Sequence, residues 1–128
     1  MPDYADVDPA VLGLVSERCL ALPEVWDEPA WTGRRFLVRK RNFAHVFAVH
    51  GVDGDLTTVL AVRAPDEERE ALLATGHPFF LLGWGRNTVG MVLDADTDWD
   101  EVTEIVTDSY CVLAPKKLVA LVDRPDPA

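Results

Sequence analysis

The spacing of apolar side chains along the chain predicts three main helices. Apolar positions recur every three or four residues from residue 8 to 21, where Pro9 suits a first helical turn. A second helix, acidic at its start, is predicted between Pro65 and Gly76. The third runs from Asp98 to a proline at residue 115, and a short helix or docked tail follows it. Its apolar stripe comprises Val102, Ile105, Val106, Tyr110 and Leu113.

Between the first two helices the pattern changes to the shorter period of strands. "RRFLVR" and "FAHVFAVH" flank the turn "KRN", and "TTVLAVR" follows a second turn, "GVDGD", whose Asp-Gly pair favours chain reversal. These segments predict a three-stranded antiparallel meander, and "TVGMVLD" is predicted to join the same sheet as a later strand. "EVWDEPAWTG" is predicted to be irregular, and "HPFFLLGWGRN" to be loop or extended.

The first hairpin of the meander has two chemically different sides. A tip at residues 40–41 places Phe36 opposite His45 and defines which side chains share a face. The mixed side, which we expect to face water, carries Arg35, Leu37 and Arg39. The bulkier side, which we expect to meet the core, carries Phe36, Val38, Phe43 and Phe47.

The order of these elements indicates an α+β fold in which helices pack on one face of an antiparallel sheet. The chain has 128 residues, of which 48% are hydrophobic, enough for one packed core. We therefore expect a single domain over residues 1–128, with short frayed ends. Cys19 and Cys111 lie in predicted helices and are expected to be buried, reduced thiols.

Charge is distributed unevenly in this acidic chain. The formal net charge is −10, yet one predicted hairpin holds five basic residues and no acid. The hairpin is either a grip for a polyanion such as nucleic acid or a solvated edge that resists strand-to-strand aggregation. A net negative field opposes general attraction to nucleic acid. The candidate nucleic-acid-binding residues are Arg34, Arg35, Arg39, Lys40 and Arg41, with Lys116 and Lys117 if the tail folds nearby.

No motif in the sequence carries recognisable catalytic or metal chemistry. Asp94, Asp96 and Asp98 match the start of a calcium loop, but Trp99 replaces its glycine and Ile105 its bidentate glutamate. Asp98 instead begins the Asp-x-x-Glu spacing of a helix N-cap. No histidine or cysteine pair has zinc-site spacing, and the serines lack a nucleophile elbow. We expect no enzymatic activity, no cofactor and no metal.

The sequence also suggests a cellular location. The N-terminus opens with acids and lacks the basic and apolar regions of a secretory signal, and the run "FFLLGW" is too short to cross a bilayer. We expect a cytoplasmic protein that does not enter membranes, with a monomer favoured.

Several blocks together resemble the YjbR/MmcQ-like family of small bacterial proteins. They are "CLALPEV", "PAWTGRRFLVRKRNFAHVF", "LAVRAPDEEREALLA" and "DWDEVTEIVTDSYCVLAPKKLVALVD", in the family's order over nearly the whole chain. The hairpin tip of the family often carries glycine, whereas this chain has "RKRN" there, which makes its tip more basic.

The resemblance implies a fold like that of the frataxin homologue CyaY, with hairpins similar to a double-wing DNA-binding arrangement. The family is usually labelled DNA-binding, a label that rests on the fold. The alternatives are a small-molecule module, a protein-interaction module, or a metal-binding module that handles iron by analogy with the fold.

Overall fold

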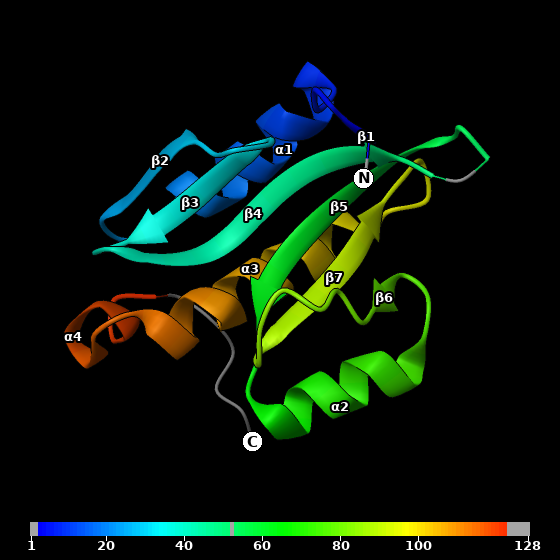
Figure 1. Cartoon of the computed structure of the whole chain (residues 1–128). Helices are drawn as coiled ribbons and strands as arrows, with labels where there is room; N and C mark the ends of the chain where they lie inside the picture. The colour runs from blue at the N-terminus through cyan, green and yellow to red at the C-terminus, as the bar shows by residue number, and fades with distance from the viewer. Residues whose placement is uncertain (1–2, 52, 123–128) are drawn as a thin grey trace.

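A computed structural model describes residues 3–51 and 53–122 of the chain. This part of the chain forms seven strands and four helices (Figure 1). The strands are β1 (Asp3–Ala5), β2 (Val25–Pro29), β3 (Arg34–Val38), β4 (Arg41–His50), β5 (Leu56–Arg63), β6 (Phe79–Phe80) and β7 (Thr88–Leu93). The helices are α1 (Pro9–Leu20), α2 (Asp66–Thr75), α3 (Trp99–Leu113) and α4 (Lys116–Val119).

All seven strands form one antiparallel sheet. Six of them lie in the order β2-β3-β4-β5-β7-β6. The short β1 pairs with residues 48–50 of β4, whereas the pairing of β3 with β4 reaches only to Val46. The predicted meander and the later strand are therefore confirmed as β3, β4, β5 and β7, and the α+β class is confirmed with them.

The two longer helices cover one face of the central strands. α3 packs against β4 and β5, and α1 packs against α3, β2 and β4, whereas α2 lies beside β6 and β7 (Figure 1). The core between helices and sheet includes Val15 and Cys19 from α1 and Val106 and Tyr110 from α3, all fully buried. Burial of this apolar area is the main term that holds the helices on the sheet.

The caps of the helices follow from local sequence. The Asp98 side chain accepts hydrogen bonds from the backbone N–H groups of Asp100 and Glu101, which confirms the predicted N-cap of α3. The Asp8 side chain caps α1 in the same way, through the N–H of Ala10.

The prediction of buried thiols holds for Cys19, whose pKa is raised strongly by burial, whereas Cys111 is half-buried.

The segment "EVWDEPAWTG" was predicted to be irregular, and that prediction is wrong for residues 25–29. These residues form β2, the outer strand of the sheet. The strand is hard to recognise because none of its side chains is buried and because it ends in Pro29, features that edge strands tolerate. Within "HPFFLLGWGRN", only Phe79 and Phe80 pair as a strand.

The predicted hairpin register is also wrong. Phe36 lies opposite Ala44 rather than His45, and Leu37 lies opposite Asn42, so that Phe43 is an extra residue on β4. A β-bulge of this kind turns two consecutive side chains towards the same face. Phe43 and Ala44 both reach the helix-covered core as a result.

Because of the bulge, the main core also differs from the predicted one. Phe36, Val38 and Phe43 lie in the main core as expected, but Phe47 lies on the opposite face of the sheet. This second face is therefore not simply exposed to water, as the alternation of side chains along the hairpin predicted. Phe47 there forms a smaller buried cluster with Val59 and Ala61.

Candidate functional site: the basic end and the open face of the sheet

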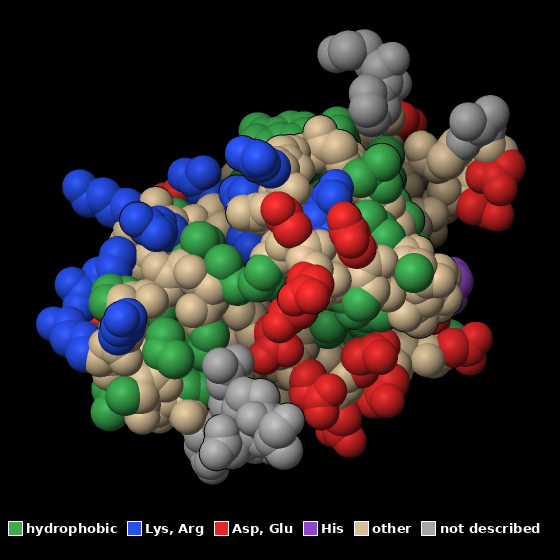
Figure 2. Space-filling view, turned by 90° about the horizontal axis from the view of Figure 1, so that it is seen from below, with side chains coloured by type: hydrophobic (Ala, Val, Ile, Leu, Met, Phe, Trp, Pro, Cys, Tyr) green, Lys and Arg blue, Asp and Glu red, His purple; other side chains and the backbone are tan. Residues whose placement is uncertain are grey.

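The β3–β4 turn and α4 lie at the same end of the molecule (Figure 1). In the view of Figure 2, Lys and Arg side chains gather on the left, whereas the Asp and Glu side chains that are visible lie mainly in the centre and on the right. We call this region the basic end and define it by Arg39, Lys40, Arg41, Lys116 and Lys117. The other two candidate cations, Arg34 and Arg35, begin β3 and lie at the end of that strand away from the turn.

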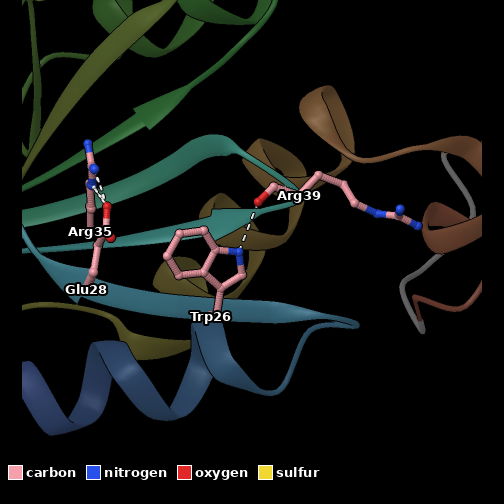
Figure 3. A network of polar contacts seen from close by, with 4 residues as sticks. All are labelled: Trp26, Glu28, Arg35 and Arg39. Carbon is pink, nitrogen blue, oxygen red and sulfur yellow. Dashed lines mark hydrogen bonds and ion pairs between the residues drawn. The ribbon is translucent and has the colours of Figure 1, made fainter.

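Three of these arginines are paired with carboxylates that precede them in sequence. Arg34 Nε lies 2.6 Å from Asp27 Oδ2, and Arg39 Nε lies 3.5 Å from Glu24 Oε1. Arg35 pairs with its cross-strand neighbour Glu28 (Figure 3). Three of the five basic residues in the stretch without acids therefore have a carboxylate partner from β2 or from the residue before it.

The remaining four cations are exposed. Lys40 and Arg41 lie at the β3–β4 turn, and Lys116 and Lys117 begin α4. Within residues 3–51 and 53–122, no carboxylate forms an ion pair with any of the four. Leu118, buried in the core, anchors α4 and so fixes the position of its two lysines.

The backbone of the turn is held by a tryptophan from β2. The Trp26 indole N–H donates to the carbonyl oxygen of Arg39 over 2.9 Å, while the Arg39 guanidinium points away from it (Figure 3). Arg39 has a left-handed backbone with φ of 59°, which a glycine adopts more readily. A glycine at this position would adopt the same conformation at lower cost.

The face of the sheet opposite α1 and α3, here called the open face, carries an aromatic cluster that the sequence did not predict. Trp84 stacks on Phe47 with ring centroids 4.6 Å apart, and it also contacts Trp31 and His45. Tyr4 completes the cluster through edge contacts with Trp31 and Phe47. Trp31 remains 68% exposed. Four separate segments of the chain supply these rings, which is why no local pattern indicated the cluster.

His45 is buried beneath this cluster. Its Nε2 lies 2.6 Å from the carbonyl oxygen of Thr32, which fixes Nε2 as the protonated nitrogen because a carbonyl can only accept. Burial lowers the pKa of His45, the nearby Arg35 lowers it further, and the bond to Thr32 partly opposes them. The imidazole is therefore neutral at pH 7 and contributes no positive charge.

The lowered pKa of His45 predicts a pH-dependent stability. Unfolded histidine titrates near about 6.5, whereas the folded group resists protonation, so the unfolded state gains protons first as the pH falls. We expect the free energy of unfolding to decrease between about pH 7 and pH 5, and His45→Gln to remove part of that decrease. Urea unfolding of both proteins at the two pH values measures it; identical decreases in the two would contradict the assignment to His45.

The described part of the chain offers no cluster of three His, Cys, Asp or Glu side chains able to hold a metal ion. None of its helices is long and apolar enough to span a bilayer.

The fold and the basic end define a class: small α+β domains in which helices back an antiparallel sheet and cations collect at one end of it. Residues 20–112 match the model of the YjbR family. The chain therefore belongs to the YjbR family, as the sequence blocks indicated. It has no significant match among curated proteins or among solved structures.

Proposed function

We propose that this chain is a non-enzymatic nucleic-acid-binding protein that contacts phosphates through Lys40, Arg41, Lys116 and Lys117. The observation that carries the proposal is the presence of four exposed cations, on two elements of one end, without a carboxylate partner among the described residues. Ammonium and guanidinium groups in this setting replace the counterions of a phosphate backbone, which is the main source of sequence-independent affinity.

The paired arginines have a different role in this proposal. Arg34 and Arg35 join β3 to β2 through their carboxylate partners, and Arg39 pairs with Glu24 just outside these strands, so all three already have a counter-charge. The exposed acids elsewhere on the surface repel a polyanion, so the polyanion can approach only at the basic end (Figure 2). Binding is therefore expected to be weak, local and strongly dependent on salt.

Fluorescence anisotropy with a labelled DNA duplex tests the proposal across a range of salt concentrations. If all four cations contact phosphates, the slope of log K against log[salt] is about −3.6, because each contact contributes about −0.9. Lys40→Gln should reduce the slope by about 0.9 and weaken binding at 50 mM salt about tenfold.

Arg86→Gln is the matched control, since it removes the same charge from the exposed loop before β7. Equal loss of DNA affinity in Lys40→Gln and Arg86→Gln would show that affinity depends on net charge alone, contrary to a defined binding site at the basic end. Absence of saturable binding to duplex and single-stranded DNA and to RNA would remove the proposal.

A further inference from the structure

A small recess opens on the open face of the sheet, beside the first residues of β4. Its volume is about 40 Å³, and it lies where β4, β5 and β7 meet the loop that precedes β7. The side chains that supply its chemistry are Asn42, His45, Arg63, Trp84 and Thr88. None of them belongs to the cations of the proposed nucleic-acid interface.

The Thr88 hydroxyl lacks a partner. Thr88 is only 4% exposed, and no group among the described residues forms a hydrogen bond with its Oγ1. Buried hydroxyls without a partner are uncommon because they lose their bonds to water without replacement. Thr88 is one of the residues that line the recess, which places this buried, unpartnered hydroxyl in its wall.

Arg63 brings a positive charge to the same place. It lies directly opposite Thr88 in the β5–β7 pairing. A methyl group built on Gly85 would lie 3.5 Å from Thr88 Oγ1 and 3.9 Å from Arg63 Nη1, so both atoms approach one point beside that glycine. Two donors of this kind, one of them charged, suit an oxyanion.

The size and charge of the recess narrow the choice of oxyanion. His45 is neutral there, which leaves the Arg63 guanidinium as the positive charge among the recess side chains. One positive charge matches a monoanion better than a phosphate that carries nearly two negative charges at pH 7. The small volume and the Trp84 ring beside it fit a planar group.

We propose that this recess binds the carboxylate of a small molecule, with Arg63 and the Thr88 hydroxyl as donors and Trp84 as one wall. This binding does not depend on the proposed nucleic-acid function, because its donors are different residues. The ligand is defined here by its carboxylate group.

Titration of the whole chain with sodium acetate, followed by ¹H–¹⁵N NMR at constant ionic strength, tests the proposal. We expect saturable shifts at the amides of Arg63, Gly85 and Thr88. Arg63→Gln should weaken acetate binding at least tenfold, whereas Lys40→Gln should leave it unchanged. A parallel titration with inorganic phosphate that saturates at lower concentration would overturn the assignment to a carboxylate.

A second variant separates ligand binding from folding. Thr88→Val removes the unpartnered hydroxyl and keeps the shape of the side chain, so we expect an equal or higher denaturation midpoint together with weaker acetate binding. A clear fall of the midpoint would mean that the hydroxyl has a structural partner, contrary to the proposal. Unsaturable shifts with acetate, or equal affinity in Arg63→Gln, would overturn it as well, whatever the result with DNA.

Discussion

Replacing Gly33 with alanine is expected to lower the free energy of unfolding by about 3 kcal/mol or more. Gly33 closes the loop between β2 and β3 with a φ of 67°, a left-handed conformation that disfavours alanine. An added Cβ would also lie 1.9 Å from the carbonyl oxygen of Val46, so the loop would have to move away from β4. That loop carries the Thr32 carbonyl that binds His45, so its displacement would also disturb the aromatic cluster. Denaturant unfolding measures the effect.

Gly13→Ala provides a control of opposite sign. Gly13 lies exposed within α1, and an added Cβ there meets no atom within 4 Å. Alanine in a helix interior is favoured over glycine by about 0.5–1 kcal/mol, so this variant should be more stable than the natural chain. A Gly33→Ala protein as stable as Gly13→Ala would contradict the close approach of the loop to β4.

Replacing Ser109 with alanine is expected to cost about 2–4 kcal/mol, because two buried backbone groups lose their partner. The Ser109 hydroxyl donates to the carbonyl oxygen of Phe43 over 2.5 Å and accepts from the N–H of Arg63 over 2.8 Å. Phe43 is the bulged residue of β4, which has no partner residue in β3. Ser109 therefore joins α3 to the irregular part of the sheet, next to the recess that Arg63 lines.

Thr103→Ala is the matched control for Ser109→Ala. Thr103 also lies on α3, but it is exposed, and its hydroxyl bonds only to the carbonyl oxygen of Trp99 in the same helix. Loss of the Thr103 hydroxyl should change the free energy of unfolding by no more than about 0.5 kcal/mol. Comparable costs for the two variants in chemical denaturation would contradict the bridging role of Ser109.

Much of the secondary structure could be predicted because its signals are local. The N-cap of α3 depends on Asp98 and on backbone N–H groups within three residues of it. The bulge at Phe43 could not be predicted in this way, because Ser109 and the packing of Phe43 against Tyr110 lie far along the chain. One inserted residue shifted the whole register and moved Phe47 to the other face.

For the candidate site, the sequence located the cations but not their partners. Arg34 and Arg35 look unopposed in a stretch without acids, yet Asp27 and Glu28 lie beside them once β2 joins the sheet. The same pairing leaves Lys40 as one of the cations with no carboxylate partner among the described residues. Which charge is available to a phosphate is therefore a property of the strand order.

The sequence by itself determined the helices, the meander, the α+β class and the family, because periodicity, caps and turns act over a few residues. Only the tertiary structure decided which arginines have carboxylate partners and which end of the molecule carries the four exposed cations. It also decided that Arg63 and Thr88 line the same recess. These depend on contacts between segments distant in sequence, whose partners are fixed by strand pairing and core packing rather than by any local pattern.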